Sequence, residues 1–177
     1  MGETVSRVTF EVNGTPVTVG SHHPHLLAAL REELNITSPK DGCSPSGQCG
    51  CCTVMVNGKA VVSCQTPLEK VNGGTVVTLE GIDQTERDRY SQAFAACGGL
   101  QCGFCIPGIV MQANVLIDEN PNPTRSEIAN ALQPNLCRCT GYKKIIDSID
   151  YAAEAIRDLR EIPFPESSGG VGKRHPK

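Results

Sequence analysis

Residues 101–108 read QCGFCIPG and residues 135–142 read NLCRCTGY, and these two segments decide how the second half of the chain folds. Each segment carries a closely spaced pair of cysteines: Cys102 and Cys105 in the first, Cys137 and Cys139 in the second. A helical pattern separates the two pairs, so helix packing can bring them together. Four thiolates make a soft tetrahedral site that suits iron–sulphur or zinc rather than hard cations. The segments therefore predict a metal site between helices.

The composition describes a small acidic protein with limited material for a hydrophobic core. Of the 177 residues, 39% are hydrophobic and 4% are aromatic, with no Trp. Small cores usually need a disulfide, a metal or a partner. The net charge of −3 argues against binding of nucleic acid, which needs a basic stripe. No apolar run reaches membrane-spanning length and residues 1–14 lack a signal-peptide pattern, so we expect a cytoplasmic protein with no membrane span.

The ten cysteines as a whole are better explained by metal binding than by disulfides. In the runs CGCC and CRC they are too crowded to pair with one another without strain, and no secretory signal accompanies them. Metal binding therefore explains them better than disulfides do. The ten cysteines are Cys43, Cys49, Cys51, Cys52, Cys64, Cys97, Cys102, Cys105, Cys137 and Cys139.

The N-terminal part predicts a hairpin followed by a helix. Apolar residues alternate with polar ones over residues 7–13, as in a half-buried strand. Asn-Gly at 13–14 signals a two-residue turn, and residues 16–19 return as the second strand. Pro24 then fits near the first position of a helix with leucines on one face. The order strand, turn, strand, helix is typical of a ferredoxin-like β-grasp domain.

Three histidines, His22, His23 and His25, lie at the entry to that helix. We interpret them as exposed loop and first-turn residues rather than as metal ligands. No Cys, Asp or Glu close to them in the sequence completes a site.

The stretch from residue 42 to 58 is rich in Gly, Ser and Cys. Its ligand candidates are Cys43, Cys49, Cys52 and Cys64, which are spaced C-x5-C-x2-C-x11-C. The first gap is one residue longer than in the plant-type ferredoxin pattern. The extra residue fits into the loop 44–48. The rival assignment uses Cys51 and leaves Cys52 out; we prefer Cys52 because it keeps the x2 spacing.

A tight loop here can aim backbone N–H groups at an anionic cluster. Asn57-Gly58 predicts a second hairpin, and residues 75–79 a further strand.

Beyond residue 81 the apolar period changes from two to about 3.6 residues, which predicts helices. The first covers residues 85–96 and leaves Cys97 as a small buried apolar residue. The second starts near Pro107, the third has a capping box of Thr124 and Glu127, and the last spans residues 141–160. Four helices with short joints predict a bundle. The spacing C-x2-C-x31-C-x-C in its turns matches neither plant ferredoxins nor zinc ribbons, so by itself it leaves zinc open.

Three motifs together carry a family resemblance: GQCGCCTV at 47–54, QCGFCIPG at 101–108 and CRCTGY at 137–142. In this order and separation they resemble the small iron–sulphur subunit of the xanthine oxidase family of molybdenum hydroxylases, over about residues 5–160. The expected fold class is α+β. We expect a plant-type ferredoxin-like β-grasp [2Fe–2S] domain at 1–81, a four-helix-bundle [2Fe–2S] domain at 82–161 and an extended tail at 162–177.

The resemblance also implies cofactors and roles. It implies two [2Fe–2S] clusters, the first held by Cys43, Cys49, Cys52 and Cys64 and the second by Cys102, Cys105, Cys137 and Cys139. Gln101 would contact the pterin of the molybdenum cofactor, and Cys139 would lie on the side of that cofactor. The implied partners are a large molybdenum–pterin subunit and a medium FAD subunit, assembled as a dimer of heterotrimers. Electrons would pass from the molybdenum site through the second cluster, then the first, to FAD.

The chain itself shows no dinucleotide fingerprint, no P-loop and no acid–base or nucleophile set, so we assign it no catalytic residues and expect substrate chemistry on a partner. Two alternatives stay open from the residues alone. One is a free-standing ferredoxin-type carrier, and the other is a zinc-stapled interaction module without a redox role.

Overall fold

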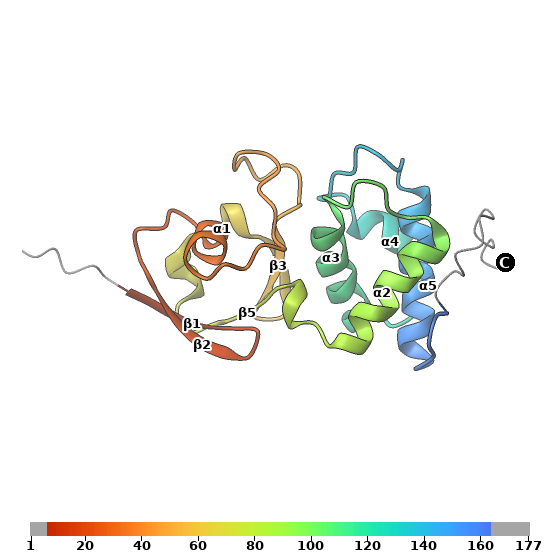
Figure 1. Cartoon of the computed structure of the whole chain (residues 1–177), viewed down its shortest axis with the longest axis horizontal. Helices are drawn as coiled ribbons and strands as arrows, with labels where there is room; N and C mark the ends of the chain where they lie inside the picture. The colour runs from red at the N-terminus through yellow and green to blue at the C-terminus, as the bar shows by residue number, and fades with distance from the viewer. Residues whose placement is uncertain (1–6, 164–177) are drawn as a thin grey trace, which may run out of the picture.

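A computed structural model describes residues 7–163 of the chain. Figure 1 shows two parts side by side: a sheet with short helices from the N-terminal half, and a group of longer helices from the C-terminal half. Helix α3, Ile106–Glu119, lies where the two parts meet and packs against strand β3, Thr53–Val56. Among the described residues, none of the helices is long and apolar enough to cross a bilayer.

The sheet has five strands in the order β2-β1-β5-β3-β4. Its remaining strands are β1 Arg7–Val12, β2 Thr15–Gly20, β4 Lys59–Val62 and β5 Thr75–Val77. Strands β1 and β5 run parallel, and the other neighbours run antiparallel. A helical crossover joins the two hairpins, which is the β-grasp arrangement. The alternation seen in the sequence of β1 corresponds to strict alternation of exposed and buried side chains.

Both predicted Asn-Gly hairpins are confirmed. Asn13 and Gly14 have φ values of 50° and 79°, and Asn57 and Gly58 have φ values of 49° and 80°. Two consecutive residues with positive φ form the type I′ turn, whose twist matches that of the flanking strands. Asn and Gly tolerate this conformation, so the two dipeptides fix the register of both hairpins.

The first helix is shorter than the sequence predicted and begins later. Helix α1, Leu26–Ala28, starts two residues after Pro24 and continues as a π-helical turn, η1, Ala29–Glu33. The reason is His25, which has an extended backbone and caps the helix by accepting the N–H of Ala28 at its Nδ1 atom, 3.1 Å away. The apolar face is as expected, with Leu26, Leu27 and Leu30 buried.

Short 3-10 turns connect the later strands: η2 Ser63–Gln65, η3 Leu68–Val71 and η4 Leu79–Gly81. The predicted strand over residues 75–79 ends at Val77, because Thr78 donates its backbone N–H to the side chain of Asn13 and η4 begins at Leu79.

Four helices form the second part, as predicted: α2 Gln84–Cys97, α3, α4 Arg125–Ala131 and α5 Lys143–Arg157. Gly98, with φ of 68°, ends α2, and the N–H of Gly99 returns to the carbonyl of Phe94 at 2.9 Å. The capping box of Thr124 and Glu127 is present at α4. Helix α5 starts at residue 143 rather than 141, because Tyr142 has a φ of 67°.

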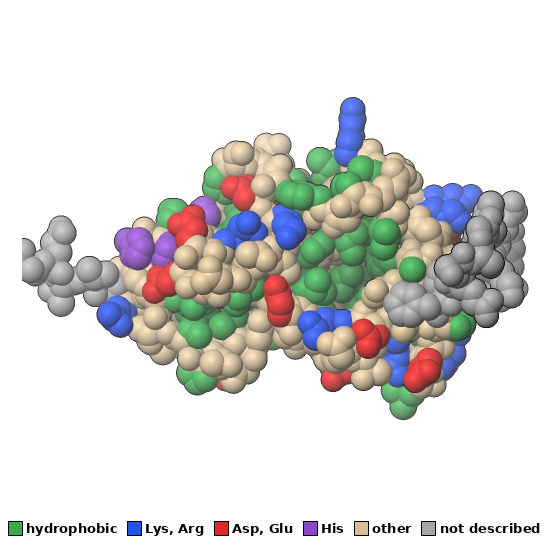
Figure 2. Space-filling model, viewed as in Figure 1, with side chains coloured by type: hydrophobic (Ala, Val, Ile, Leu, Met, Phe, Trp, Pro, Cys, Tyr) green, Lys and Arg blue, Asp and Glu red, His purple; other side chains and the backbone are tan. Residues whose placement is uncertain are grey.

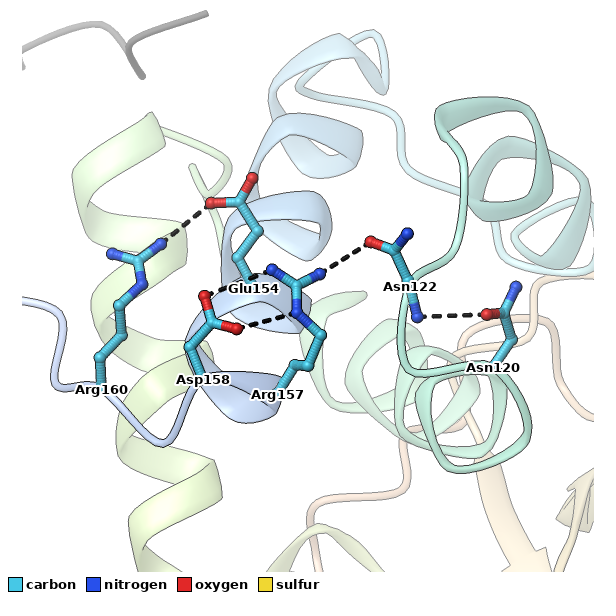
Figure 3. A network of polar contacts seen from close by, with 6 residues as sticks. All are labelled: Asn120, Asn122, Glu154, Arg157, Asp158 and Arg160. Carbon is cyan, nitrogen blue, oxygen red and sulfur yellow. Dashed lines mark hydrogen bonds and ion pairs between the residues drawn. The ribbon is translucent and has the colours of Figure 1, made fainter.

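The C-terminal end of α5 is tied to the loop between α3 and α4 by a polar network (Figure 3). Arg157 donates to Asn122 at 2.7 Å and to Asp158 at 2.8 Å, and Arg160 donates to Glu154 at 2.9 Å. Ile162, the first residue of the predicted tail, is buried in the helical core. Residues 164–177 of that tail lie outside the described residues.

The sheet and the helices have separate core clusters among the described residues, although Met55 and Val77 of the sheet also pack against the helical core. Cys49 and Cys51 belong by sequence to the sheet part, yet they are buried in the helical core together with Cys105 and Cys137. The loop of residues 49–51 therefore reaches across the boundary between the two parts.

Candidate metal centres

The structure brings the two cysteine pairs of the helical part together. Cys102 and Cys105 lie in the turn before α3, and Cys137 and Cys139 lie in the turn between α4 and α5. The sulphurs of Cys102 and Cys139 are 3.5 Å apart and exposed, whereas Cys105 and Cys137 are buried and interact with each other. We call these four residues the helical cysteine site.

Hydrogen bonds fix the two turns of the helical cysteine site against each other. Gln101 donates its side-chain amide to the carbonyl of Cys139 at 3.1 Å. The hydroxyl of Tyr142 accepts the N–H of Cys137 at 2.8 Å and donates to the carbonyl of Asn135 at 3.0 Å. The second turn is therefore braced by its own tyrosine.

The thiols of this site have unequal proton affinities. Burial, with the neighbouring Cys137, raises the pKa of Cys105 to about 12. Burial acts in the same direction on Cys137, but hydrogen bonds from the Thr140 hydroxyl and nearby backbone N–H groups outweigh it and lower its pKa. The backbone N–H of Phe104 lowers the pKa of Cys102. Hydrogen bonds to sulphur thus favour negative charge at two of the four positions.

The second group, which we call the loop cysteine site, consists of Cys43, Cys49, Cys52 and Cys64. Cys49, Cys52 and Cys64 are buried, and Cys43 is half-buried. The Ser46 hydroxyl, together with the backbone N–H groups of Cys49 and Gln48, lowers the pKa of Cys43 to about 6. Burial and the adjacent Cys52 raise the pKa of Cys64 to about 12. Cys52 and Cys64 therefore lie next to each other, with Cys43 close to Cys64.

Cys51 lies between the two sites. It is 4% exposed, and its thiol donates to the carbonyl of Cys49 at 3.7 Å. Burial, followed by interaction with Cys49, raises its pKa to about 12, and Cys105 and Cys52 also act on it.

Cys97 differs from its prediction. It is half-buried, not buried, and it is the last residue of α2, near Lys144, Asp147 and Asp150 of α5. Burial and Asp147 raise the pKa of its thiol.

Backbone contacts join the two sites directly. The N–H of Leu136 donates to the carbonyl of Cys49 at 2.8 Å, and the side chain of Asn135 donates to the carbonyl of Gly50 at 2.9 Å. Gly50 has a φ of 64°, and a Cβ atom there would overlap the Pro134 carbonyl. A Cβ atom at Gly108, in the first turn of α3, would overlap the carbonyl of Gly50. Close approach of backbone to backbone thus holds the loop against the helices.

Sequence reasoning did not single out Asn135, Gly50 or Gly108. All three lie inside the quoted motifs, but only the fold shows that residue 50 meets residues 108 and 135. The only sequence signal that could have pointed to these three residues was their position within a cysteine motif.

The histidine interpretation needs a correction. His23 is 7% exposed, and its Nε2 atom lies 2.8 Å from a carboxylate oxygen of Glu33. An acidic partner therefore does complete the group, because η1 brings residue 33 back to the loop after β2. His25 is the cap of α1, as described above.

The donor chemistry of both cysteine sites fits [2Fe–2S] clusters. Each site offers four thiol sulphurs, and such clusters are held by four Cys thiolates. A thiolate-bound cluster is negatively charged, and oriented N–H groups stabilise an anion in a buried place. Backbone N–H groups point at Cys43, Cys64, Cys102 and Cys137.

Comparison with known proteins agrees with this chemistry. The "2Fe-2S iron-sulfur cluster binding domain" family matches residues 10–79, and the "[2Fe-2S] binding domain" family matches residues 78–150. The chain is 40% identical over 149 residues to the nicotinate dehydrogenase small FeS subunit of Eubacterium barkeri, covering 83% of this chain and 94% of that one. It is 37% identical to a probable xanthine dehydrogenase subunit of Bacillus subtilis, covering 82% of this chain and 80% of that one.

The fold comparison gives the same result. The crystal structure of quinoline 2-oxidoreductase from Pseudomonas putida 86 superimposes with a TM-score of 0.78 at 39% identity, covering 86% of this chain and 96% of that chain. Some relatives are much longer: the chain spans 18% of the aldehyde oxidoreductase of Megalodesulfovibrio gigas.

Fold and donor sets together define an iron–sulphur protein with two different [2Fe–2S] domains, one ferredoxin-like and one helical. The chain belongs to the xanthine oxidase family of molybdenum hydroxylases, as its small [2Fe–2S] subunit. It is an electron-transfer component of an oxidoreductase. The predicted α+β fold class and the prediction of two [2Fe–2S] clusters are confirmed, and the zinc-module alternative loses its support.

Proposed function

We propose that the chain carries electrons from a molybdenum–pterin site on a large subunit to FAD on a medium subunit. The observation that carries this proposal is the direct backbone link between the two cysteine sites, from Leu136 to Cys49. A protein that only bound metals for stability would not need to hold two cysteine sites close together by a backbone hydrogen bond. The substrate reaction takes place on the large subunit, because this chain contributes no acid–base or nucleophile set.

The loop cysteine site holds one cluster and the helical cysteine site holds the other. Support for Cys52 over Cys51 comes from packing: Cys52 is buried in one cluster with Cys64, whereas Cys51 is buried in the helical core with Cys105. A bound [2Fe–2S] cluster supplies one-electron redox chemistry. The residues of this chain fix its position and tune its potential through charge, hydrogen bonds and exposure.

Gln101 and Cys139 face the molybdenum–pterin cofactor of the large subunit. Both are exposed, and the Gln101 amide already reaches the backbone of Cys139. Three large apolar side chains on the same turns are also exposed: Leu100, Phe104 and Leu136. An exposed apolar group around a redox site is typical of a surface that a partner covers.

We place the division between the two domains at residues 81 and 82 and the end of the helical domain at residue 161. The two matching families meet at residues 78–79, which supports a division close to this position. The assembly is a cytoplasmic dimer of heterotrimers, by analogy with enzymes built from separate subunits.

Iron and acid-labile sulphide analysis of the purified chain tests the proposal. We expect four irons and four sulphides, as two [2Fe–2S] clusters require, and two distinguishable paramagnetic signals after reduction. Cys64→Ser should remove one signal and Cys105→Ser the other. Zinc without sulphide, or a single signal from fully loaded protein, would overturn the proposal. Co-purification with a large and a medium chain separates a subunit from a free-standing carrier.

A further inference from the structure

Two histidines and a carboxylate outside the cysteine sites converge at the edge of the sheet. One ring nitrogen each of His22 and His23 and one carboxylate oxygen of Glu33 all lie within 4.8 Å of one another. His22 and His23 come from the loop after β2, and Glu33 is the last residue of η1. In Figure 2, histidine side chains gather next to acidic ones at the end of the molecule formed by the sheet part.

We propose that His22, His23 and Glu33 form a binding site for a borderline divalent transition metal ion such as Zn²⁺. Imidazole nitrogens and a carboxylate suit Zn²⁺, Ni²⁺ or Cu²⁺ better than Ca²⁺ or Mg²⁺, which prefer oxygen ligands alone. Two His and one Glu leave a fourth position open for water or a further ligand.

The ligands of this site are held by neighbours, as metal ligands usually are. His23 is 7% exposed, and its Nδ1 atom lies 3.8 Å from a carboxylate oxygen of Glu32. A carboxylate beside the second ring nitrogen orients a ligating histidine and raises its basicity. The backbone N–H of Gly20 donates to the Glu33 carboxylate at 3.1 Å, which positions that ligand as well.

The site is also accessible and needs little rearrangement. Zinc ligands lie about 2.0–2.2 Å from the ion, so the three donor atoms must approach one another by roughly 1 Å. His22 and Glu33 are exposed, so small side-chain rotations can bring them in. Bound metal would replace the direct contact of His23 with Glu33 and tie the loop after β2 to the end of η1.

Zinc titration by calorimetry tests this site in the full chain with its iron and sulphide retained. The informative variant is His22→Ala, because the exposed His22 can be removed without opening the core. The matched control is His25→Asn, which removes a neighbouring imidazole and keeps a capping side chain for α1. We expect the wild type and His25→Asn to bind one more Zn²⁺ than His22→Ala does. Glu32→Gln should weaken this binding about tenfold or more.

Thermal unfolding supplies a second measurement. A ligand that binds only the folded state raises its melting temperature. Zn²⁺ should therefore raise the Tm of the wild type and of His25→Asn more than that of His22→Ala. Equal zinc binding and equal Tm shifts in all three proteins would mean that His23 and Glu33 form only a hydrogen bond, and the proposal would be wrong. All variants keep the ten cysteines, so iron and sulphide analysis reports on the two proposed clusters independently of zinc binding.

Discussion

The backbone N–H of Leu136 donates a hydrogen bond to the carbonyl oxygen of Cys49 across 2.8 Å. Leu136 directly precedes Cys137 of the helical cysteine site, and Cys49 belongs to the loop cysteine site. One hydrogen bond and a few covalent bonds thus connect a proposed ligand of one cluster with a proposed ligand of the other. The contacts around this bond decide how rigidly the two sites are spaced.

Asn135→Ala should destabilise the chain by about 1–3 kcal/mol. Asn135 is 2% exposed, and its side chain donates to the carbonyl of Gly50 at 2.9 Å, so the substitution removes a buried hydrogen bond and leaves a gap. Denaturant unfolding measures the change, with the exposed Asn130→Ala as control. Equal stability of the two variants would show that Asn135 does not hold the loop in place.

Gly50→Ala should be considerably more damaging than Gly58→Ala. Both glycines have positive φ, which costs a residue with a side chain roughly 1–2 kcal/mol. At Gly58 a Cβ atom meets nothing within 4 Å, whereas at Gly50 it overlaps the Pro134 carbonyl. The difference between the two unfolding free energies therefore isolates the close contact between the loop and the helices. Similar losses in both variants would contradict this packing.

Cys51→Ala and Cys52→Ala should differ in iron content. If Cys52 is a ligand and Cys51 is not, Cys51→Ala keeps four irons and Cys52→Ala loses the cluster of the loop site. Iron analysis and the paramagnetic signals of the reduced protein measure this. The reverse result would transfer the ligand role to Cys51.

Tyr142→Phe should change the helical site and leave the loop site unchanged. The Tyr142 hydroxyl accepts the N–H of Cys137 at 2.8 Å, so its removal takes the hydrogen-bond partner away from that N–H, next to a proposed ligand sulphur. Hydrogen bonding near the sulphurs tunes the potential of a cluster. We expect a shift in the reduction potential of one of the two signals, and the other signal serves as the internal control. Identical shifts of both would point to a general loosening of the fold.

Glu80 should give the sheet part an acid-sensitive stability. Burial favours the neutral acid, but hydrogen bonds from Ser38 and Thr78, each 2.6 Å from the carboxylate, outweigh it and lower the pKa of Glu80 below its ordinary value of 4.5. A carboxyl whose pKa is lower in the folded state contributes stability above pH 4.5. This contribution is lost as the pH falls through the lowered value.

The comparison of wild type with Glu80→Gln across this range measures the effect. The difference in unfolding free energy should be largest near neutral pH and should shrink at acidic pH. A constant difference at all pH values would show that the charge of Glu80 is not involved.

Local sequence signals were sufficient for most of the secondary structure. Asn13-Gly14 and Asn57-Gly58 specify their turns by themselves, because positive φ at two consecutive positions is a property of the dipeptide. The capping box of Thr124 and Glu127 is equally local. The sequence predicted a start of α1 that is too early. Three histidines close together do not reveal that the side chain of one of them, His25, caps the helix.

The cysteine sites were predicted from spacing and from a family resemblance together. Spacing alone divided the eight candidate ligands into two sets of four, but it could not distinguish zinc from iron in the helical site. The resemblance to a family made that choice, and it also supplied the expected partners.

The sequence by itself thus determined the two hairpins, the four helices and the closely spaced cysteines of each motif, since each of these depends on residues close together in the chain. Only the tertiary structure decided that Leu136 reaches Cys49, that Gly50 fits against Gly108, and that Glu33 meets His23. These contacts join segments of the chain that no sequence motif links to one another. Their geometry follows from how the sheet and the helices pack, and packing is a property of the whole chain.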